Sequence, residues 1–256
     1  MRPPKTYIFS SYFTKKKHPQ SIDPTCIGIG KNGRVPQDDF GYIQKWADSL
    51  KKPYYKPVLF HDGVSGDFQD KFPHIQFELA DGSYDAYSLN DARFLYYSDF
   101  LHDKEDVDCA SIIFMTDASD VVITGDPLLL THREKGHVFY TGGENKKLVD
   151  YNCSFGGSYQ DAHNAFGFDG NPLQIREFPL INMGVLGGFS DKVCNFLREF
   201  KKKRIDIGYT SYNMNMPLGN NILRNLYEDR ILVGDPVTSA YKGFENKRED
   251  VYFIHK

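Results

Sequence analysis

Two aspartates, Asp117 and Asp120, stand between two short apolar runs at residues 112–115 and 121–123. Continuous β-branched and aromatic runs of this kind are typical of strands buried on both faces, so the pair is expected where a central strand ends. Neighbouring buried carboxylates are costly and repel each other. A divalent cation removes both costs, and oxygen ligands suit Mg²⁺ or Mn²⁺. An Asp/Ser turn in which Asp120 caps the next segment explains the same spacing without a metal.

The composition limits the classes of function. The 256 residues are 40% hydrophobic, enough for one large α/β domain or two small ones. A net charge of −3 argues against a general nucleic-acid binder. The four cysteines lie far apart and fit neither a zinc site nor a disulfide framework. No apolar run could span a bilayer and no leader follows Met1, so we expect a soluble, cytoplasmic protein.

Strand and helix patterns alternate along the chain. Period-2 and continuous apolar patterns predict strands at residues 6–10, 57–61, 75–79, 112–115, 121–123, 137–141, 180–188, 231–233 and 251–254. Helical spacing predicts helices at residues 38–50, 92–101, 190–202 and 216–227. Residues 15–37 and 150–171 are expected to be loops, and no GxGxxG opens a helix in the first of them. The alternation predicts one α/β sandwich.

The order of the short motifs is informative. A strand opens the chain, a helix with Arg93 precedes the acid pair, an Asn182-x-Gly184 strand follows it, and His255 ends a late strand. This order resembles that of metal-dependent, nucleotide-sugar glycosyltransferases of the GT-A fold. The D-x-x-D spacing, which departs from the commoner D-x-D, is most similar to the glycosyltransferase domain of procollagen lysyl hydroxylases, and the order also resembles glycogenin-like enzymes. The resemblance implies a single α/β/α domain over residues 1–256, with a mixed central sheet.

The resemblance also implies a metal site. Asp117 and Asp120 would hold Mn²⁺ or Mg²⁺ against the donor diphosphate, and His255 would complete the metal shell. A cation there stabilises the charge that grows on a leaving nucleoside diphosphate. Lys256 could reach a phosphate. Taken alone, His255 is better explained as a residue of a disordered tail, and the apolar run that leads to it favours the metal site.

Residues after the first two strands match the nucleoside side of such a site. Ser10, Ser11 and Tyr12 follow the first strand, where family members contact the nucleoside, and Tyr12 could stack on the base. Asp62 could accept a hydrogen bond from the base or the ribose. The alternative for Asp62 is an ordinary Asp-Gly turn.

The helix before the metal strand carries Asn90 and Arg93, at the place where related enzymes put a basic donor-binding residue. A guanidinium fork suits a pyrophosphate. The alternative is an ion pair between Arg93 and Asp91 or Asp99.

Candidates for the sugar side follow the acid pair. Asn182 and Gly184 match a pattern that lines the sugar and acceptor side in retaining members, although the glycine could also be a bulge. Glu144 could contact the sugar or act as a base, or lie in a surface turn. At Asn215, where relatives often place acids, this chain has asparagine, which could bind sugar hydroxyls. The missing acid favours retention, whereas inversion would require a base such as Glu144 or Asp150.

The expected function is transfer of a sugar from a nucleoside-diphosphate sugar, with UDP as the expected nucleotide, to a hydroxyl of a glycan or glycoprotein. A nucleotidyltransferase that makes nucleotide sugars is an alternative, but residues 11–15 lack the Gly-rich basic loop typical of that class. A non-catalytic carbohydrate-binding module, whose aromatic residues stack on sugars and whose acids hold a structural cation, is a second alternative. The oligomeric state is not indicated.

Overall fold

A mixed seven-stranded sheet forms the centre of the computed structural model, which describes residues 4–16, 34–102, 111–152, 158–171, 177–208, 212–243 and 245–256. The strand order is β3-β2-β1-β4-β7-β6-β8. Among these strands β7 alone is antiparallel to its neighbours. The strands are β1 (Thr6–Tyr12), β2 (Tyr55–His61), β3 (Gln76–Leu79), β4 (Ile112–Thr116), β6 (Phe139–Lys147), β7 (Pro179–Phe189) and β8 (Ile231–Val233).

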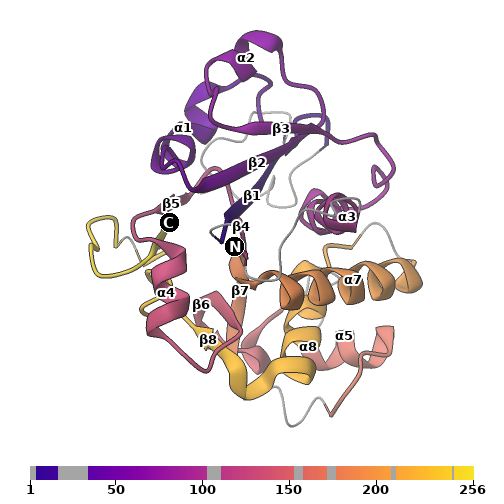
Figure 1. The fold of residues 1–256 in the computed structure, drawn as a ribbon. Coiled ribbons are helices and arrows are strands. Elements are labelled where there is room, and N and C mark those ends of the chain that lie inside the picture. The colour runs from indigo at the N-terminus through magenta and orange to yellow at the C-terminus, as the bar shows by residue number, and fades with distance from the viewer. Residues whose placement is uncertain are drawn as a thin grey trace.

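Helices cover both faces of this sheet (Figure 1). One face carries α1 (Phe40–Ser49), α2 (Gly66–Asp70) and α4 (Pro127–Arg133). The other carries α3 (Leu89–His102), α5 (Tyr159–Phe166), α7 (Ser190–Ile207) and α8 (Asn215–Tyr227). Short 3-10 turns, η1 (Leu148–Asp150) and η2 (Glu228–Arg230), follow β6 and α8. The predicted α/β/α sandwich with a mixed sheet is therefore confirmed.

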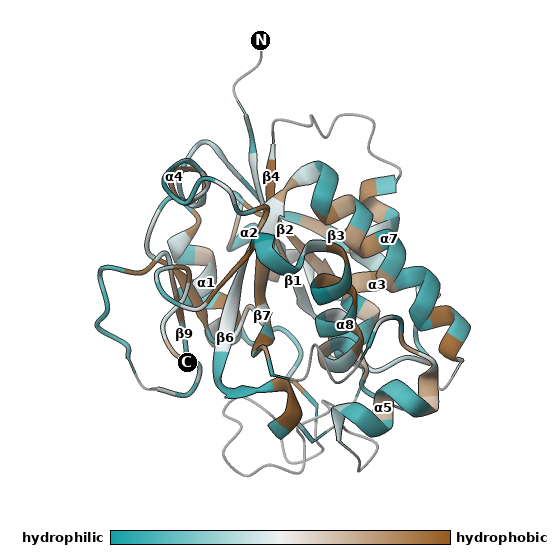
Figure 2. Cartoon of the chain, turned by 90° about the horizontal axis from the view of Figure 1, so that it is seen from below, coloured by the Kyte–Doolittle hydropathy of each residue, from teal (hydrophilic) through white to brown (hydrophobic). Residues whose placement is uncertain are grey.

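The central strands are hydrophobic without interruption because both of their faces are buried. All five residues of β4 are buried. Successive side chains of a strand point to opposite faces. Accordingly, Ile112 and Phe114 belong to the core on the face of α1, and Ile113 and Met115 belong to the core on the face of α3 and α7. In Figure 2 much of α5 and α7 is coloured as hydrophilic. None of the described helices has the length and apolarity needed to cross a membrane.

A second, two-stranded sheet joins distant parts of the sequence. β5 (Val121–Ile123) pairs antiparallel with β9 (Phe253–His255), with Val121 opposite His255. The backbone N–H of Lys256 donates to the carbonyl of Asp120 at 3.1 Å. The ring of Phe253 lies 4.9 Å from that of Phe114, which anchors β9 to the main sheet. The last residues of the chain therefore lie beside the turn that follows β4.

Three short helices were not predicted. α2 and α4 begin at side-chain caps, Ser65 and Asp126, and Pro127 occupies the first turn of α4. α5 lies within the segment expected to be a loop and begins at a capping box between Ser158 and Asp161. Each of these helices spans eight residues or fewer, too short for apolar periodicity to reveal it. Most of the other predicted loop, residues 17–33, lies outside the described residues.

Candidate functional site

Asp117 and Asp120 lie at the carboxyl ends of the parallel strands. Asp117 follows the last residue of β4, and its backbone N–H donates to the carbonyl of Gly184 on β7 at 2.9 Å. A turn leads from there to Asp120, which directly precedes β5. Both ends of the turn are therefore tied to strand hydrogen bonds. In open α/β sheets, ligands bind outside this edge of the sheet.

β9 brings His255 to the acid pair. One potential ligand atom from each of Asp117, Asp120 and His255 lies within 4.8 Å of the other two. The Nε2 atom of His255 is 3.9 Å from Oδ2 of Asp120. His255 is 2% exposed. The structure thus places the three residues predicted as metal ligands in one group. We call Asp117, Asp120 and His255 the metal cluster after this prediction.

The protonation of these groups suits a metal. Burial lowers the pKa of His255 to about 4, so the imidazole is neutral at physiological pH. Burial, followed by the nearby carboxylate of Asp117, raises the pKa of Asp120 to about 8. Metal ligation requires a neutral imidazole and ionised carboxylates. The cluster therefore presents a ready nitrogen ligand and a carboxyl group whose proton a cation would displace.

Two observations test whether these residues fit a cation. Neither ring nitrogen of His255 has a hydrogen-bond partner among the described residues, although buried polar atoms are normally paired. A Cβ added to Gly184 would lie 2.5 Å from Cε1 of His255 and 2.7 Å from Oδ2 of Asp117. The glycine therefore leaves room for the imidazole and the carboxylate to converge. Two carboxylates and one imidazole fit Mn²⁺, and the carboxylates also suit Mg²⁺.

Asn182 links the metal cluster to Glu144. Its Oδ1 accepts the backbone N–H of Gly184 at 2.7 Å, and its Nδ2 donates to Oε1 of Glu144 at 3.0 Å. Asn182 is buried and Glu144 is half-buried. The Asn-x-Gly pattern thus fixes the local shape of β7 and orients a carboxylate on β6.

Arg93 has partners other than those predicted. Its guanidinium donates to Oδ1 of Asp117 and, at 3.0 Å, to the carbonyl of Met183. The guanidinium therefore pairs with Asp117, where the sequence alternative named Asp91 or Asp99, and its contact with a pyrophosphate stays a prediction. Arg93 is 7% exposed, and a buried guanidinium requires internal acceptors. Its position makes it a support for Asp117.

The three residues of β1 that were predicted to contact the nucleoside differ in their exposure. Ser10 is buried, and its hydroxyl donates to the carbonyl of Thr116 at 2.6 Å. Tyr12 is 1% exposed and stacks on Phe68, with ring centroids 5.3 Å apart. Both side chains therefore belong to the core in this structure, and their contacts with a nucleoside stay predictions. Ser11 is half-buried and remains a candidate.

Asp62 is also engaged internally. Its carboxylate accepts the backbone N–H groups of Thr14 at 2.9 Å and of Lys15 at 2.8 Å. It therefore fixes the segment that follows β1, and its contact with a base or ribose stays a prediction.

The remaining predicted residues lie at three different places. Asn90 is half-buried in the first turn of α3. Asn215 is buried at the start of α8, where its backbone N–H donates to Asp91. Lys256 is half-buried directly after β9 and beside Asp120. Of these three, the structure brings Lys256 to the metal cluster.

Two residues of α1 near the cluster were not predicted as site residues from the sequence. Tyr42 hydrogen-bonds Ser119 of the turn between the two aspartates, and burial raises the pKa of the Tyr42 hydroxyl. Lys45 is exposed, and its side chain lies against that of Lys256. Burial, followed by this neighbouring charge, lowers the pKa of Lys256. No local signal marks these residues, because the contacts join α1 to the turn after β4 and to the end of the chain.

A cavity of about 460 Å³ lies elsewhere in the molecule. It is lined by residues of α4, by Ile112 at the start of β4 and by Phe189 at the end of β7. It includes none of the predicted site residues and is at the opposite end of β4 from Asp117.

Comparison with known proteins finds similarity in structure alone. No protein-family model and no curated protein matches the sequence. The bifunctional glycosyltransferase WbbM, in its apo form, is similar with a TM-score of 0.51 and 14% identity over 100% of this chain. This chain spans 46% of WbbM, less than half of its length.

The galactosyltransferase LgtC, in complex with donor and acceptor sugar analogues, is similar with a TM-score of 0.53 and 11% identity. The match covers 97% of this chain and 86% of LgtC. An active-site mutant of LgtC gives a TM-score of 0.54 over the same shares. These similarities establish the GT-A fold, and at such identities they establish the fold alone.

Proposed function

We propose that this chain is a metal-dependent glycosyltransferase that moves a sugar from a nucleoside-diphosphate sugar to a hydroxyl of a glycan or glycoprotein. The observation that carries the proposal is the cluster of Asp117, Asp120 and buried His255 at the carboxyl edge of a GT-A sheet, where the ring nitrogens of His255 have no hydrogen-bond partner among the described residues. In the proposal these residues hold Mn²⁺ or Mg²⁺. A bound cation supplies Lewis-acid stabilisation for the negative charge on the departing diphosphate.

The residues around the cluster have supporting roles in this proposal. Arg93 holds Asp117 in position through its guanidinium. The tightly packed Gly184 lets the imidazole of His255 approach that carboxylate. Preorganised groups of this kind need no rearrangement when charge develops in the transition state.

Lys45 and Lys256 are proposed to neutralise the phosphates. Two carboxylates balance the charge of a divalent cation, so these lysines and Arg93 leave the site positive. Their side chains lie together beside Asp120, and two neighbouring ammonium groups favour an anion between them. A nucleoside diphosphate is such an anion, and we propose UDP as the nucleotide.

Glu144 and Asn182 are proposed to face the transferred sugar. Their hydrogen bond fixes the carboxylate near the metal cluster. The chain has asparagine at position 215, where relatives often have an acid, and this favours retention of configuration. In a retaining route the leaving phosphate helps to deprotonate the acceptor hydroxyl. In an inverting route Glu144 would take that proton as general base.

The proposal is tested by measuring the thermal unfolding of the protein in the presence of UDP-, GDP- and TDP-sugars, with and without Mn²⁺. A ligand that binds the native state raises its stability by mass action, by about 2.7 kcal/mol at a concentration 100 times its Kd. We expect a Mn²⁺-dependent shift with a UDP-sugar, and loss of that shift and of sugar transfer in Asp120→Asn. Asp126→Asn is the matched control, because asparagine also caps a helix and Asp126 caps α4.

The alternatives predict different results in the same assays. Release of pyrophosphate from a nucleoside triphosphate would identify a nucleotidyltransferase. Glycan binding without any binding of nucleotide sugars would identify a carbohydrate-binding module. Full transfer activity in Asp120→Asn would contradict the proposed metal site.

A further inference from the structure

The outer edge of β9 is closed by a short segment of the same chain. In an antiparallel pair, alternate residues direct their N–H and C=O groups away from the partner strand. On β9 these outward groups belong to Phe253 and His255. The N–H of Phe253 donates to the carbonyl of Val237 at 2.9 Å, and its carbonyl accepts the N–H of Ser239 at 3.0 Å. Residues 237–239 therefore act as a third strand beside β9.

At His255 the hydrogen bonds to this segment are made by a side chain instead of the backbone. The N–H of His255 donates to Oγ of Ser239 at 2.9 Å, and the same hydroxyl donates to the carbonyl of His255 at 3.2 Å. A hydroxyl can donate and accept at once, so one side chain satisfies both backbone groups. Ser239 is 1% exposed. The ring of Tyr241 lies 4.5 Å from the imidazole of His255.

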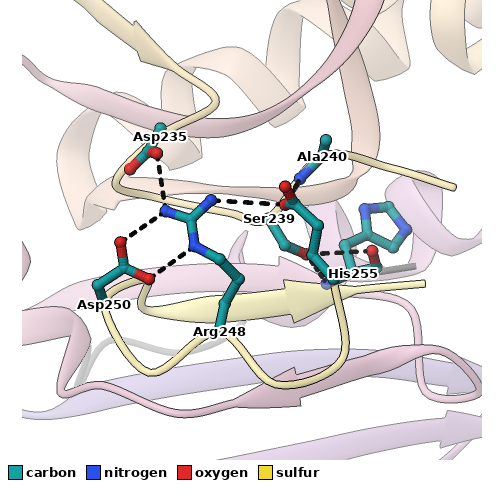
Figure 3. Close-up of polar contacts among 7 residues, drawn as sticks. Asp235, Ser239, Ala240, Arg248, Asp250 and His255 are labelled. Carbon is teal, nitrogen blue, oxygen red and sulfur yellow. Dashed lines mark hydrogen bonds and ion pairs between the residues drawn. The ribbon is translucent and has the colours of Figure 1, made fainter. Parts of the chain in front are cut away.

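An ionic cluster ties together the loop that carries Ser239 (Figure 3). Arg248 donates to Asp235 at 2.8 Å and to Asp250 at 2.6 Å, so it joins the two ends of the loop. Within the loop, the carboxylate of Glu245 accepts the N–H of Ala240 at 2.8 Å. These contacts hold residues 236–239 in register with β9.

We propose that Ser239 is a positioning residue for His255, and that Arg248 maintains the loop in which Ser239 acts. The inference rests on the proposed metal site and assigns a specific support to its nitrogen ligand. The imidazole itself has no hydrogen-bond partner among the described residues, so its direction depends on its backbone and on the packing of Tyr241 and Gly184 around it. Groups that orient metal ligands commonly change metal affinity about 10- to 100-fold when they are removed.

Ser239→Ala, with Ser65→Ala as the matched control, tests the role of the hydroxyl. Ser65 caps α2 through its side chain, so its loss lowers stability at a position outside the metal cluster. Titration calorimetry with Mn²⁺ alone is expected to give binding about 10- to 100-fold weaker in Ser239→Ala. Ser65→Ala is expected to bind Mn²⁺ as the wild type does. Equal affinities in Ser239→Ala and the wild type would overturn the proposal.

A second measurement does not require metal binding. In protein labelled with ¹³C-histidine, His255→Gln identifies the ring signals of His255. We expect Ser239→Ala to shift or broaden these signals and Ser65→Ala to leave them unchanged. Unchanged signals in Ser239→Ala would refute the positioning role, whereas absence of Mn²⁺ binding in the wild type with shifted signals would refute the metal site alone.

Arg248→Gln tests the loop. The ion pairs are exposed, with the side chains of Asp235 and Asp250 64% and 71% exposed, so each contributes modestly and is screened by salt. We expect Mn²⁺ binding to weaken about two- to fivefold, the range that exposed ion pairs allow. Wild-type affinity should also fall more with added salt than that of Arg248→Gln. Unchanged affinity in Arg248→Gln would exclude Arg248 from the positioning role.

Discussion

At the scale of the residue, the absence of a side chain at Gly184 gives the metal cluster the space that it occupies. Its position on β7 faces both His255 and Asp117. It also donates to Asn182 and accepts from Asp117, so its backbone is held on both sides. The same residue therefore supports the carboxylate and leaves space for the imidazole.

Gly184→Ala is predicted to separate the proposed metal ligands. The added Cβ would lie 2.5 Å from Cε1 of His255, so the imidazole must move. A displacement of about 1 Å can cost roughly 100-fold in rate, and we expect a loss of this order in sugar transfer. Calorimetry with Mn²⁺ should show weakened binding.

Gly66→Ala is the control for this substitution, because a Cβ there meets nothing within 4 Å. Wild-type Mn²⁺ affinity in Gly184→Ala would show that the imidazole and the carboxylate do not need to converge.

At the scale of the element, α3 connects the metal cluster with two other helices. Its Arg93 holds Asp117, and Asp91, two residues earlier, pairs with Arg204 of α7 at 2.7 Å. Asp91 also accepts the N–H of Met214 at 3.0 Å, at the start of α8. Burial raises the pKa of Asp91, with Arg204 acting against that rise. One turn of α3 therefore fixes the relative positions of α7, α8 and the end of β4.

Arg204→Met is predicted to destabilise the fold strongly. Both side chains of the Arg204–Asp91 pair are fully buried, and removing one partner leaves an uncompensated charge that costs about 3–5 kcal/mol. Urea unfolding measures this change in the free energy of unfolding.

Lys201→Met supplies the comparison, since Lys201 pairs with Asp99 between the same two helices but is partly exposed. In Lys201→Met the free energy of unfolding is expected to fall by about 1 kcal/mol or less. Equal losses in the two variants would show that burial does not determine the strength of these pairs.

At the scale of the whole molecule, the fold brings residues from the middle and from the end of the sequence to one edge of the central sheet. β4 supplies Asp117, β7 supplies Gly184, and β9 supplies His255. β5 and the segment at residues 237–239 hold β9 between them. The site thus depends on pairings between segments more than 100 residues apart, such as Val121 with His255.

The sequence predicted the parts of this arrangement that leave a local pattern. Continuous apolar runs located β4 and β5 and thereby placed the two aspartates, and the order of motifs indicated the GT-A fold. The partners of buried polar groups were not predictable in the same way. Tyr12 after a strand has the same local sequence whether it stacks on Phe68 or on a ligand. The hydrogen-bond acceptors of Arg93 lie on β7 and at the end of β4, far from it in the sequence.

Supporting residues were also missed, because their contacts are distant in sequence. The side chain of Lys45 lies against that of Lys256. The hydroxyl of Ser239 bonds the backbone of His255 from a loop that carries no recognisable motif. The proposed metal ligands could be inferred from their chemistry, whereas the groups that support them required the fold.

The most direct test of the account is anomalous diffraction at the manganese edge from crystals of this chain grown with Mn²⁺ and UDP. We predict one strong peak bonded to carboxylate oxygens of Asp117 and Asp120 and to a ring nitrogen of His255, with the diphosphate of UDP beside it. A peak away from these three side chains, or no peak in crystals that contain UDP, would contradict the central claim.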